Sequence, residues 1–467
     1  MKYIFLVLMA FGSLGFQGQT WTIDQCIDYA IKNNISIKQG ALNVQTAKNN
    51  VLVSKASVLP NLNLGAAHTY NFGKTIDRFT NTFADQMVLS QNVFVSTSVT
   101  LWSGLSQYNT IKQNELAYLS AAENVKQNQN DLALNVATAF LQVVYAKQLI
   151  GVQELQVNMS SEQLERTKKL IDAGTIAPGN IFDIEAQLAT DEYNLTSANS
   201  NYQISLLTLK QLMNLDTAAN FNIQQPILDP GQSEIDKINV VSVYNEALKN
   251  QPLIKSAEYA WKSAEKGLSV AKGGRSPSLL LSGGLGTGYS GLNYNYDFTY
   301  SSYLAGYTSS LDSVFLIQPN AIQKGVKSFA DQYSANINKS ISLQLNIPIF
   351  TGLRTHINVE NNKLNLLNQK LNYDLARQQL FKNIAQAHAN AVAAMDKYKS
   401  SKIATEAAEK SFQFSETKFN AGAISSFEFS TAKNRWMKAQ ADLLNAKFDY
   451  IFRLKVLDFY QGKPLTF

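Results

Sequence analysis

The heptapeptide VTLWSGL, residues 99–105, has a partner in IPIFTGL, residues 347–353, at a distance of 248 residues. Each ends in Gly-Leu, follows a segment of alternating apolar and polar residues, and precedes a long stretch without proline. The same offset holds without gaps as far as Gly174/Gly422 and Tyr202/Tyr450. Such self-similarity at a fixed spacing indicates an internal repeat.

A second alignment extends the repeat toward the N-terminus. The segment that starts at Tyr29 matches the one that starts at Glu246 at an offset of 217, and Pro60 meets Pro277. The chain is therefore a tandem duplication. The offsets of 217 and 248 differ by 31 residues, all of which fall between Leu281 and Ser340. Because insertions concentrate in exposed loops, we expect a long loop over residues 282–338.

The first residues, MKYIFLVLMAFGSLGFQGQT, place Lys2 before an apolar run and then small residues, which predicts a secretory signal peptide over residues 1–18. No later run reaches the roughly 18 apolar residues of a spanning helix, so we expect export without helical membrane anchoring. A lone cysteine, Cys26, excludes an internal disulfide framework and is expected to be a buried apolar residue in a helix. The net charge of +6 is spread along the chain, and no nucleic-acid partner is expected.

The repeat divides the chain into a first structural repeat over residues 19–216, a linker or equatorial segment over 217–237, and a second repeat over 238–467. Each repeat contains two alternating segments, predicted as strands at about residues 61–73 and 91–102, and at about 278–289 and 339–350. In the last of these, Ile341, Leu343 and Leu345 share one face while Ser340 and Ser342 share the other. A period of two over about 9 to 11 residues is typical of a tilted strand that crosses a bilayer.

Helical periodicity follows the strands in both repeats. Long helices are expected over residues 105–172 and 353–420, each roughly 100 Å at 1.5 Å per residue. Alternating spacings of four and three mark a coiled-coil seam along both. Its residues are Val136, Phe140, Val143, Lys147 and Ile150 in the first and Ile384, His388, Ala391, Met395 and Tyr398 in the second. Return helices are expected over residues 181–212 and 427–460.

An Ala-Gly pair stands at the end of each long helix, in DAGTIAPGN from residue 172 and in NAGAISSFE from residue 420. Glycine here predicts a left-handed C-cap that ends one helix and begins a helical hairpin. Pro178 in the first hairpin, and Ser425 or Ser426 in the second, suit the start of the returning helix.

Four strands in one chain are too few for a membrane barrel, which needs about eight or more strands, and open sheet edges are not tolerated in lipid. Several copies of the chain must therefore share one barrel. The long helices would then continue the barrel as a tube of roughly 100 Å, with the hairpins at its far end. The sequence therefore predicts a channel that continues from the membrane barrel through the helical tube.

The sequence resembles the TolC family of outer-membrane efflux and secretion proteins. The resemblance rests on these features taken together: the duplication, CIDYAIKNN from Cys26, the prolines at 60 and 277, LWSGL and IPIFTGL, the Ala-Gly hairpins, and NAKFDY from Asn445. The resemblance implies a fold that is mainly α with a membrane β-barrel: a homotrimer with a 12-stranded barrel in outer-membrane lipid and an α-helical barrel in the periplasm. It also implies an exit duct for efflux or type I secretion, supplied by an inner-membrane pump of RND or ABC type through a periplasmic adaptor, or membrane fusion, protein.

By the same resemblance, the hairpin tips contact the adaptor and form the closable periplasmic entrance. The tip residues are Ala173, Gly174, Thr175, Ile176, Ala421, Gly422, Ala423 and Ile424. Glu428 stands where the family's second hairpin commonly has an acidic residue that lines the entrance, whereas its first-repeat counterpart is Asn180. Alternatively, the glycines are ordinary C-caps and Glu428 is a solvated acid in the first turn of a helix.

Sequence motifs for other functions are weak. We expect no enzyme activity, cofactor or metal site, because no nucleophile-base pair or phosphate loop stands out and His68 and His356 have no partners at metal spacing. The tyrosine-rich segment from Tyr294 to Tyr307 fits either a membrane-interface girdle or an extracellular loop. A periplasmic coiled-coil scaffold or adhesin-like protein without a pore is the alternative function. A scaffold or adhesin of this kind does not explain why the chain has two pairs of strands long enough to cross a bilayer.

Overall fold

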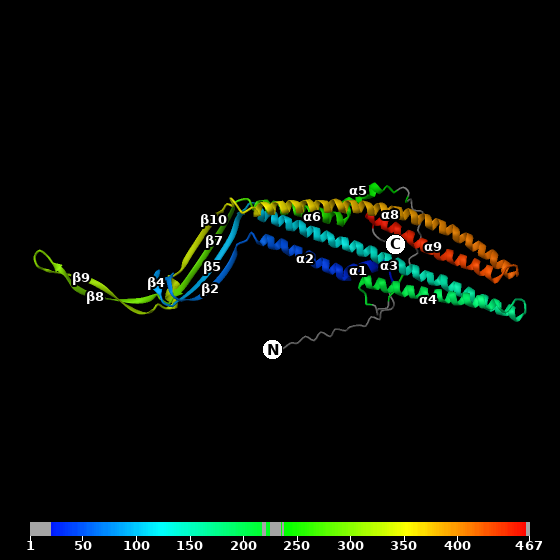
Figure 1. Cartoon of the computed structure of the whole chain (residues 1–467), viewed down its shortest axis with the longest axis horizontal. Coiled ribbons are helices and arrows are strands. Elements are labelled where there is room, and N and C mark those ends of the chain that lie inside the picture. Colours follow the sequence, from blue (N-terminus) through cyan, green and yellow to red (C-terminus); the bar gives the residue numbers. More distant parts are fainter. Residues whose placement is uncertain (1–19, 217–220, 225–234, 236–237, 464–467) are drawn as a thin grey trace, which may run out of the picture. The chain divides into compact units, whose positions relative to one another are not determined.

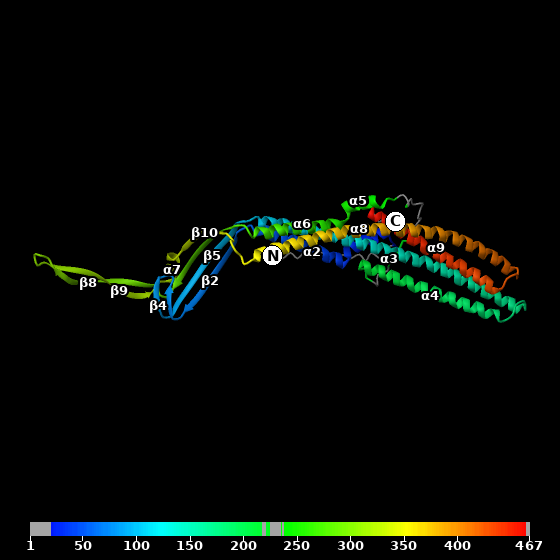
Figure 2. The same cartoon turned by 45° about the horizontal axis from the view of Figure 1, so that its top comes forward.

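The computed structural model describes residues 20–216, 221–224, 235 and 238–463. The predicted signal peptide and most of the predicted linker at 217–237 lie outside these residues. The chain divides into two compact units (Figures 1 and 2). We call Met1–Lys48, Leu116–Lys262 and Leu367–Phe467 the helical unit, and Asn49–Glu115 and Ser263–Leu366 the sheet unit.

Both repeats contain the same order of elements, two short helices, two main strands, a long helix and a return helix. The first repeat has α1 (Ile23–Asn33), α2 (Ile35–Ala56), β2 (Asn61–Asn71), β5 (Val88–Ser103), α3 (Ser106–Asp172) and α4 (Asn180–Met213). The second has α5 (Val240–Asn250), α6 (Pro252–Gly273), β7 (Ser278–Ser290), β10 (Asn338–Asn346), α8 (Arg354–Asn420) and α9 (Ser426–Tyr460). The predicted mainly helical fold with four principal strands is confirmed.

The four principal strands form one antiparallel sheet in the order β10-β7-β5-β2. Among them, Lys339 is the one Lys, Arg, Asp or Glu residue. Apolar residues of β10 stand on one face and are exposed, with Leu343 63% and Leu345 60% accessible. An antiparallel sheet whose apolar face is uncovered in the single chain is suited to lipid rather than to water.

The segment expected to be a loop contains regular structure instead. β8 (Tyr294–Tyr307) and β9 (Ser313–Val326) pair as a separate antiparallel ribbon, followed by the short helix α7 (Phe329–Ala335). The first repeat has a much shorter hairpin there, β3 (Lys74–Asp77) with β4 (Thr82–Asp85). Alternation of aromatic and polar residues from Tyr294 to Tyr300 explains the ribbon, since period-two patterns favour strands. A short parallel pair, β1 (Thr20–Trp21) with β6 (Asn222–Ile223), lies in the helical unit.

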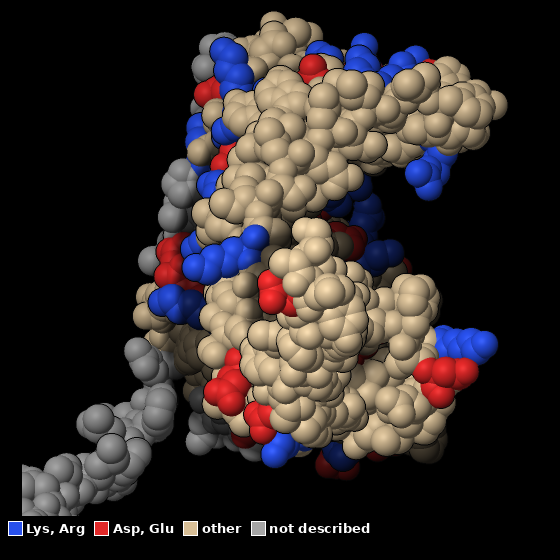
Figure 3. Space-filling model, turned by 90° about the vertical axis from the view of Figure 1, so that its left-hand side faces the viewer, with Lys and Arg blue, Asp and Glu red and all other residues tan. Residues whose placement is uncertain are grey.

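The ribbon's aromatic residues are largely exposed. Figure 3 shows the charged side chains scattered among larger areas of uncharged residues. Tyr296, Phe298 and Tyr300 belong to the β8–β9 pair and not to the four-stranded sheet. This position separates them from the strands that carry the lipid-compatible face.

The helical unit contains equivalent cores in the two repeats. The core of the first repeat includes the buried residues Cys26, Ala30, Ile37, Leu132 and Val136. The residues at the equivalent positions are also buried together in the second repeat. They are Val243, Ala247, Ile254, Leu380 and Ile384. Cys26 is fully buried and unpaired in α1, as predicted. The exchange of cysteine for valine at equivalent positions agrees with a packing role.

The coiled-coil seam is mostly buried, and His388, Tyr398 and Lys147 are its exceptions; Tyr398 is half-buried. His388 is half-buried and its Nε2 lies 3.3 Å from the carbonyl oxygen of Ile235, where the first repeat has fully buried Phe140. Lys147 is exposed, and its ammonium group lies 5.2 Å from the ring centroid of Tyr202. Among the described helices, α3 alone is long and apolar enough to cross a bilayer, and half of its most apolar window is buried within the protein.

The quoted heptapeptides form the turn from strand to long helix in the sheet unit. Gly104 and Leu105 have φ values of 61° and 62°, and Gly352 and Leu353 have 60° and 64°. Two successive residues in the left-handed region reverse the backbone between strand and helix, and glycine adopts the first of these conformations without steric cost. The same turn in both repeats explains why these heptapeptides are alike.

Candidate functional site

The two hairpin tips lie at the same end of the helical unit (Figure 1) and have the same backbone geometry. At the end of α3, the N–H of Gly174 donates to the Ile171 carbonyl at 2.8 Å, and the N–H of Thr175 to the Leu170 carbonyl at 3.0 Å. The second tip repeats this pattern from Gly422 to Phe419 at 3.0 Å and from Ala423 to Lys418 at 2.9 Å. These are Schellman motifs, so the predicted left-handed caps are confirmed.

Gly174 and Gly422 have φ values of 72° and 70°, and neither has another group within 4 Å of the position that a Cβ would occupy. The glycines are required by conformation rather than by crowding. Around them, Ala173, Thr175, Ala421 and Ala423 are exposed, while Ile176 and Ile424 are half-buried. The tips therefore present small side chains to the surroundings, and one isoleucine in each is partly covered.

Glu428 belongs to the N-terminal cap of α9. Its carboxylate accepts hydrogen bonds from the backbone N–H of Ser425 at 2.9 Å and from the Ser425 hydroxyl at 3.1 Å. The N–H of Glu428 donates to the Ser425 hydroxyl at 3.2 Å, which completes a capping box. The hydrogen bonds from Ser425 lower the pKa of the Glu428 carboxyl, so it carries a full negative charge at neutral pH.

The start of α4 has no equivalent carboxylate. Asn180 is its first residue and is half-buried, and the cap position, Gly179, makes no side-chain hydrogen bond. Pro178 lies two residues before the helix and its carbonyl accepts from the N–H of Ile181 at 3.3 Å. The two tips thus share their helix ends but differ in where the first acidic residue stands: Glu428 belongs to the cap of α9, whereas the acidic residue in the first turn of α4 is Asp183.

A buried polar cluster, which the sequence analysis did not identify, links three helices behind the tips. Asp191 on α4 and Lys433 on α9 form an ion pair at 3.2 Å, with side chains 0% and 3% exposed. Ser160 on α3 donates to the Asp191 carboxylate and receives a hydrogen bond from Lys433. Gln156 and Gln187 each donate to the other carboxylate oxygen, at 2.7 and 2.8 Å.

Burial shapes the electrostatics of this cluster. Removal from water lowers the pKa of the Lys433 ammonium, while the Asp191 carboxylate opposes this effect. The several hydrogen bonds to Asp191 replace the water that its carboxylate loses. The cluster therefore ties α9 to the α3–α4 hairpin by a charge pair that neither partner can leave without a large desolvation penalty.

The repeat itself shows that the fold does not require this cluster. At equivalent positions of the second repeat, Gln156, Ser160 and Asp191 are replaced by alanines, Ala404, Ala408 and Ala439. A position-by-position comparison of the repeats was the one sequence signal that could have revealed the cluster. It was missed because single polar residues in a helix usually lie on a solvated face.

A second link lies closer to the tips. Arg166 on α3 donates to the side-chain oxygen of Asn420, and its guanidinium stands 5.6 Å from the ring centroid of Phe419. Phe419 in turn stacks with Phe429 on α9, with centroids 4.8 Å apart. The two hairpins are thus in contact through α3 and α8 as well as through the buried cluster.

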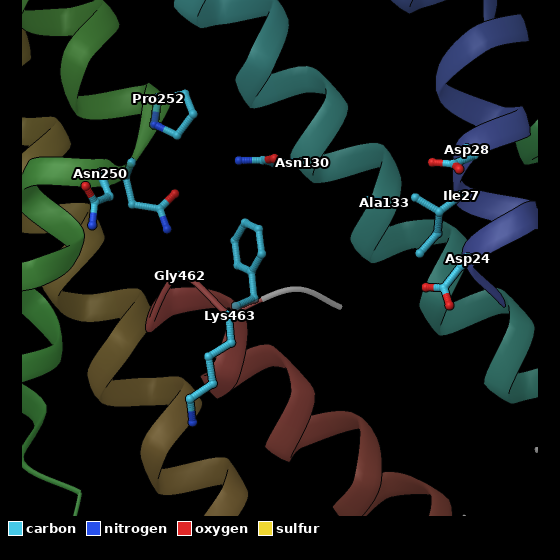
Figure 4. A pocket seen from close by; sticks show the side chains of 11 residues that line it. Asp24, Ile27, Asp28, Asn130, Ala133, Asn250, Pro252, Gly462 and Lys463 are labelled. Carbon is cyan, nitrogen blue, oxygen red and sulfur yellow. The ribbon is translucent and has the colours of Figure 1, made fainter. Parts of the chain in front are cut away.

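Figure 4 shows a pocket of about 540 Å³ in the helical unit, away from the tips. Asp24 and Asp28 on α1 and Asn130 on α3 contribute to its lining, as does Lys463, whose ammonium pairs with Asp458 at 3.0 Å. In the described part of the chain, no three His, Cys, Asp or Glu side chains are placed to hold a metal ion. We assign no ligand to this pocket.

Comparison with known proteins adds to this geometry. A family model described as "Outer membrane efflux protein" matches residues 26–215 and 243–462. The chain is 21% identical over 456 residues to outer membrane protein TolC of Escherichia coli strain K12, which covers 97% of this chain and 84% of that protein. It is also 21% identical over 429 residues to the cation efflux system protein CusC of Escherichia coli O6:H1, covering 90% and 82%.

Solved structures show the same fold. The chain aligns with the outer membrane protein VceC of Vibrio cholerae with a TM-score of 0.77 at 14% identity, covering 95% of this chain and 97% of that one. A structure of CusC gives a TM-score of 0.77 at 16% identity, covering 95% and 92%. The agreement spans both repeats.

Proposed function

The chain belongs to the outer membrane efflux protein family, and from this premise we propose that it forms, as a homotrimer, the outer-membrane exit duct of a tripartite efflux or type I secretion system. Substrates would reach the duct from an inner-membrane pump through a periplasmic adaptor protein and leave the cell through the barrel. The chain is an outer-membrane efflux protein, and the trimer, the adaptor and the pump are the proposed parts.

The four-stranded sheet carries this proposal. It contains a single charged residue, has one exposed apolar face, and ends in strands β2 and β10, which have no further neighbouring strand in the described part of the chain. Unpaired edges cannot remain in a bilayer because no water satisfies their backbone groups. Three copies would supply twelve strands and remove every edge.

The proposed role of the tips is to meet the adaptor and to line the periplasmic entrance. Support comes from their exposed small residues, their shared geometry and the ionised Glu428 carboxylate in the second hairpin. A ring of three such carboxylates would attract cations toward the entrance. The Ser425 contact limits how far the carboxylate can reach, so its effect is through its field rather than through contact with substrate.

Assembly is tested by gel electrophoresis of purified protein with and without heating. An unheated sample should run at the size of a trimer, a heated one as the 51.7 kDa chain or its processed form. Pore activity is tested in parallel by single-channel recording in planar bilayers. Recovery as a water-soluble monomer without conductance would contradict the proposal.

The entrance proposal has its own test. Glu428→Gln should lower the preference of single-channel currents for cations, because it removes three charges from the ring while a side chain of similar size remains. Asn180→Asp should raise that preference. Ser425→Ala, which weakens the same cap without removing charge, is the control. Unchanged currents in both charge variants would exclude these positions from the entrance.

A further inference from the structure

The polar face of the four-stranded sheet contains no charged residue. Four residues that are direct neighbours across the strands define this face: Asn63, Ser96, Gly284 and Ser340. The one charged residue of the four strands, Lys339, stands on the other face, opposite Leu285. In the proposed trimer the apolar face meets lipid, so the polar face would line the bore of the barrel. A wall without charges does not by itself favour cations or anions.

The turn between β3 and β4 lies over this polar face. Gly288, opposite Asn92, belongs to the face, and a Cβ on Gly288 would lie only 2.7 Å from Cε1 of the Phe79 ring. Two cavities flank the turn, one of about 580 Å³ toward β7 and β10 and one of about 150 Å³ toward β2. Arg78, Phe79 and Asn92 line both cavities. The turn would therefore narrow the bore above Asn92.

The order of the chain places this turn at the end of the sheet farthest from the long helices. β2 ends at Asn71 and β5 begins at Val88, so the β3–β4 hairpin joins the two strands at the end opposite to Gly104 and the start of α3. In the proposed duct the long helices lie in the periplasm. The turn would then stand at the outer opening of the barrel.

Asp77 holds the turn in place. It is 3% exposed, and one oxygen of its carboxylate accepts hydrogen bonds from the N–H of Phe79 at 2.8 Å and of Thr80 at 3.3 Å. The other oxygen accepts a hydrogen bond from the Ser290 hydroxyl at the end of β7. The turn is thus tied to the sheet on both sides of Arg78, by Asp77 before it and by Phe79 after it.

Arg78 is the uncompensated charge of this turn. Its side chain is exposed and forms no ion pair with any residue in the described part of the chain. The other cation of the hairpin, Lys74, lies 3.9 Å from the Asp85 carboxylate. A guanidinium stays protonated at any physiological pH, so Arg78 keeps its full charge. The second repeat has no arginine between residues 282 and 338, so a trimer would contain three arginines of this kind.

The larger cavity beside Arg78 suits an anion. Ser96, Asn338 and Ser340 contribute hydroxyl and amide groups to its wall, and these groups can donate hydrogen bonds. No Asp or Glu is among the described residues that line it. A guanidinium beside neutral donors is an arrangement that stabilises carboxylate and phosphate groups.

We propose that Arg78 makes the outer opening of the barrel selective for anions, including solutes that carry a carboxylate or phosphate group. The inference rests on the proposed trimeric duct and adds a second point of charge selection to it. Glu428 belongs to the helical unit and would favour cations at the entrance, whereas Arg78 belongs to the sheet unit and would favour anions at the exit. Each charge can be removed while the other remains.

The ion preference is measured as the reversal potential of single-channel currents across a KCl gradient. Arg78→Gln should lower the chloride-to-potassium permeability ratio by at least about twofold, because it removes the charge from the opening. Arg78→Lys should retain most of the ratio. The matched control is Lys74→Gln, which makes the same change of charge in the same hairpin, at a residue that lines neither cavity.

Salt concentration gives a second readout of the same variants. The difference between the unaltered protein and Arg78→Gln should shrink as the Debye length falls from about 10 Å at 0.1 M to about 3 Å at 1 M ionic strength. A change in the width of the opening alone would persist at both concentrations and would contradict a role for the charge.

Chemical modification tests where the side chain lies. The thiol introduced by Arg78→Cys should react with methanethiosulfonate reagents during recording. A cationic reagent should restore the anion preference and an anionic reagent should reverse it. Native Cys26 is buried and does not interfere.

Failure of this inference differs from failure of the duct itself. A conducting trimer whose ion preference is the same with Arg78→Gln, or changes equally with Lys74→Gln, would overturn the role of Arg78 and leave the duct intact. An introduced thiol that stays unreactive in open channels would do the same. An unaltered protein that runs as a monomer on unheated gels and does not conduct would contradict the proposed duct.

Discussion

At the scale of single residues, the Asp191–Lys433 pair is the most consequential interaction behind the tips. Both side chains are almost completely buried, and each depends on the other for charge neutralisation. A buried pair of this kind often adds little net stability over a well-packed apolar pair, yet removal of one partner is costly. We therefore expect the pair to specify how α9 sits on α3 and α4 rather than to supply most of the stability.

Lys433→Met should destabilise the helical unit by about 3 kcal/mol or more, since it leaves the Asp191 carboxylate buried without a counter-charge. Asp191→Leu combined with Lys433→Met should recover most of that loss. The midpoint of thermal loss of the helical circular dichroism signal, at one protein concentration, measures both. Lys169→Met, in an exposed pair with Glu165, is the control and should change little. A double variant as unstable as the single would show that the charges themselves are required.

Cys26 provides a second prediction at this scale. Burial raises the pKa of its thiol to about 12, so almost no thiolate exists at pH 8. The native protein should not react with a charged maleimide over hours, whereas denatured protein should react fully. Cys26→Val, the residue at the equivalent position of the second repeat, should leave the melting midpoint nearly unchanged. Rapid labelling of folded protein would mean that α1 detaches from the core.

At the scale of elements, the hairpin tips depend on backbone conformation more than on side-chain contacts. Both long helices end in a Schellman motif whose glycine has a positive φ, and both glycines stand in open space. The equal length of α3 and α8, 67 residues each, places the two turns at equivalent points of the repeats.

Gly174→Ala and Gly422→Ala should each destabilise their hairpin by about 1 to 2 kcal/mol, the cost of the left-handed conformation for an L residue. Gly151→Ala is the matched control, because Gly151 lies exposed within α3 with free space around it and alanine favours the helix by up to about 1 kcal/mol. Hydrogen exchange of the tip amides would show the difference locally. Equal protection in all three variants would contradict the proposed role of the glycine conformation.

At the scale of the whole molecule, the four-stranded sheet and the β8–β9 ribbon are separate sheets. The four-stranded sheet contains all strands that the repeat relates, whereas β8 and β9 pair only with each other. The residues before and after the ribbon are adjacent, since the N–H of Lys327 donates a hydrogen bond to the Asn293 carbonyl at 2.8 Å. A short connection can therefore replace it without stretching the chain.

Replacement of residues 294–326 by two glycines should leave the unheated oligomer and its conductance intact, because register and edges belong to β2, β5, β7 and β10. Gel mobility before and after heating, together with single-channel recording, measures the result. Disruption of α7 by Gln332→Ala is the comparison, since buried Gln332 bonds to both the N–H and the carbonyl of Ser290 on β7. If the oligomer is lost when the ribbon is removed, the ribbon is required for assembly and the prediction is wrong.

Much of this organisation could be predicted because the repeat is visible in the sequence. Two ungapped alignments revealed the order of elements, the four strands and the positions of Gly174 and Gly422. The ribbon was missed because its Tyr-, Ser- and Asn-rich composition is shared by loops and exposed strands. The cluster around Asp191 was missed because its residues come from three helices, and each on its own resembles a solvated side chain.

The sequence by itself determined the duplication, the alternation of strands and helices and the glycine caps, since these follow from local periodicity and backbone conformation. Only the tertiary structure decided which strands are neighbours and which polar residues are buried together. Glu428 shows the same division, since its charge is visible in the sequence but its engagement by Ser425 depends on how the turn folds. Strand register and burial depend on contacts between residues far apart in the chain, which local patterns do not encode.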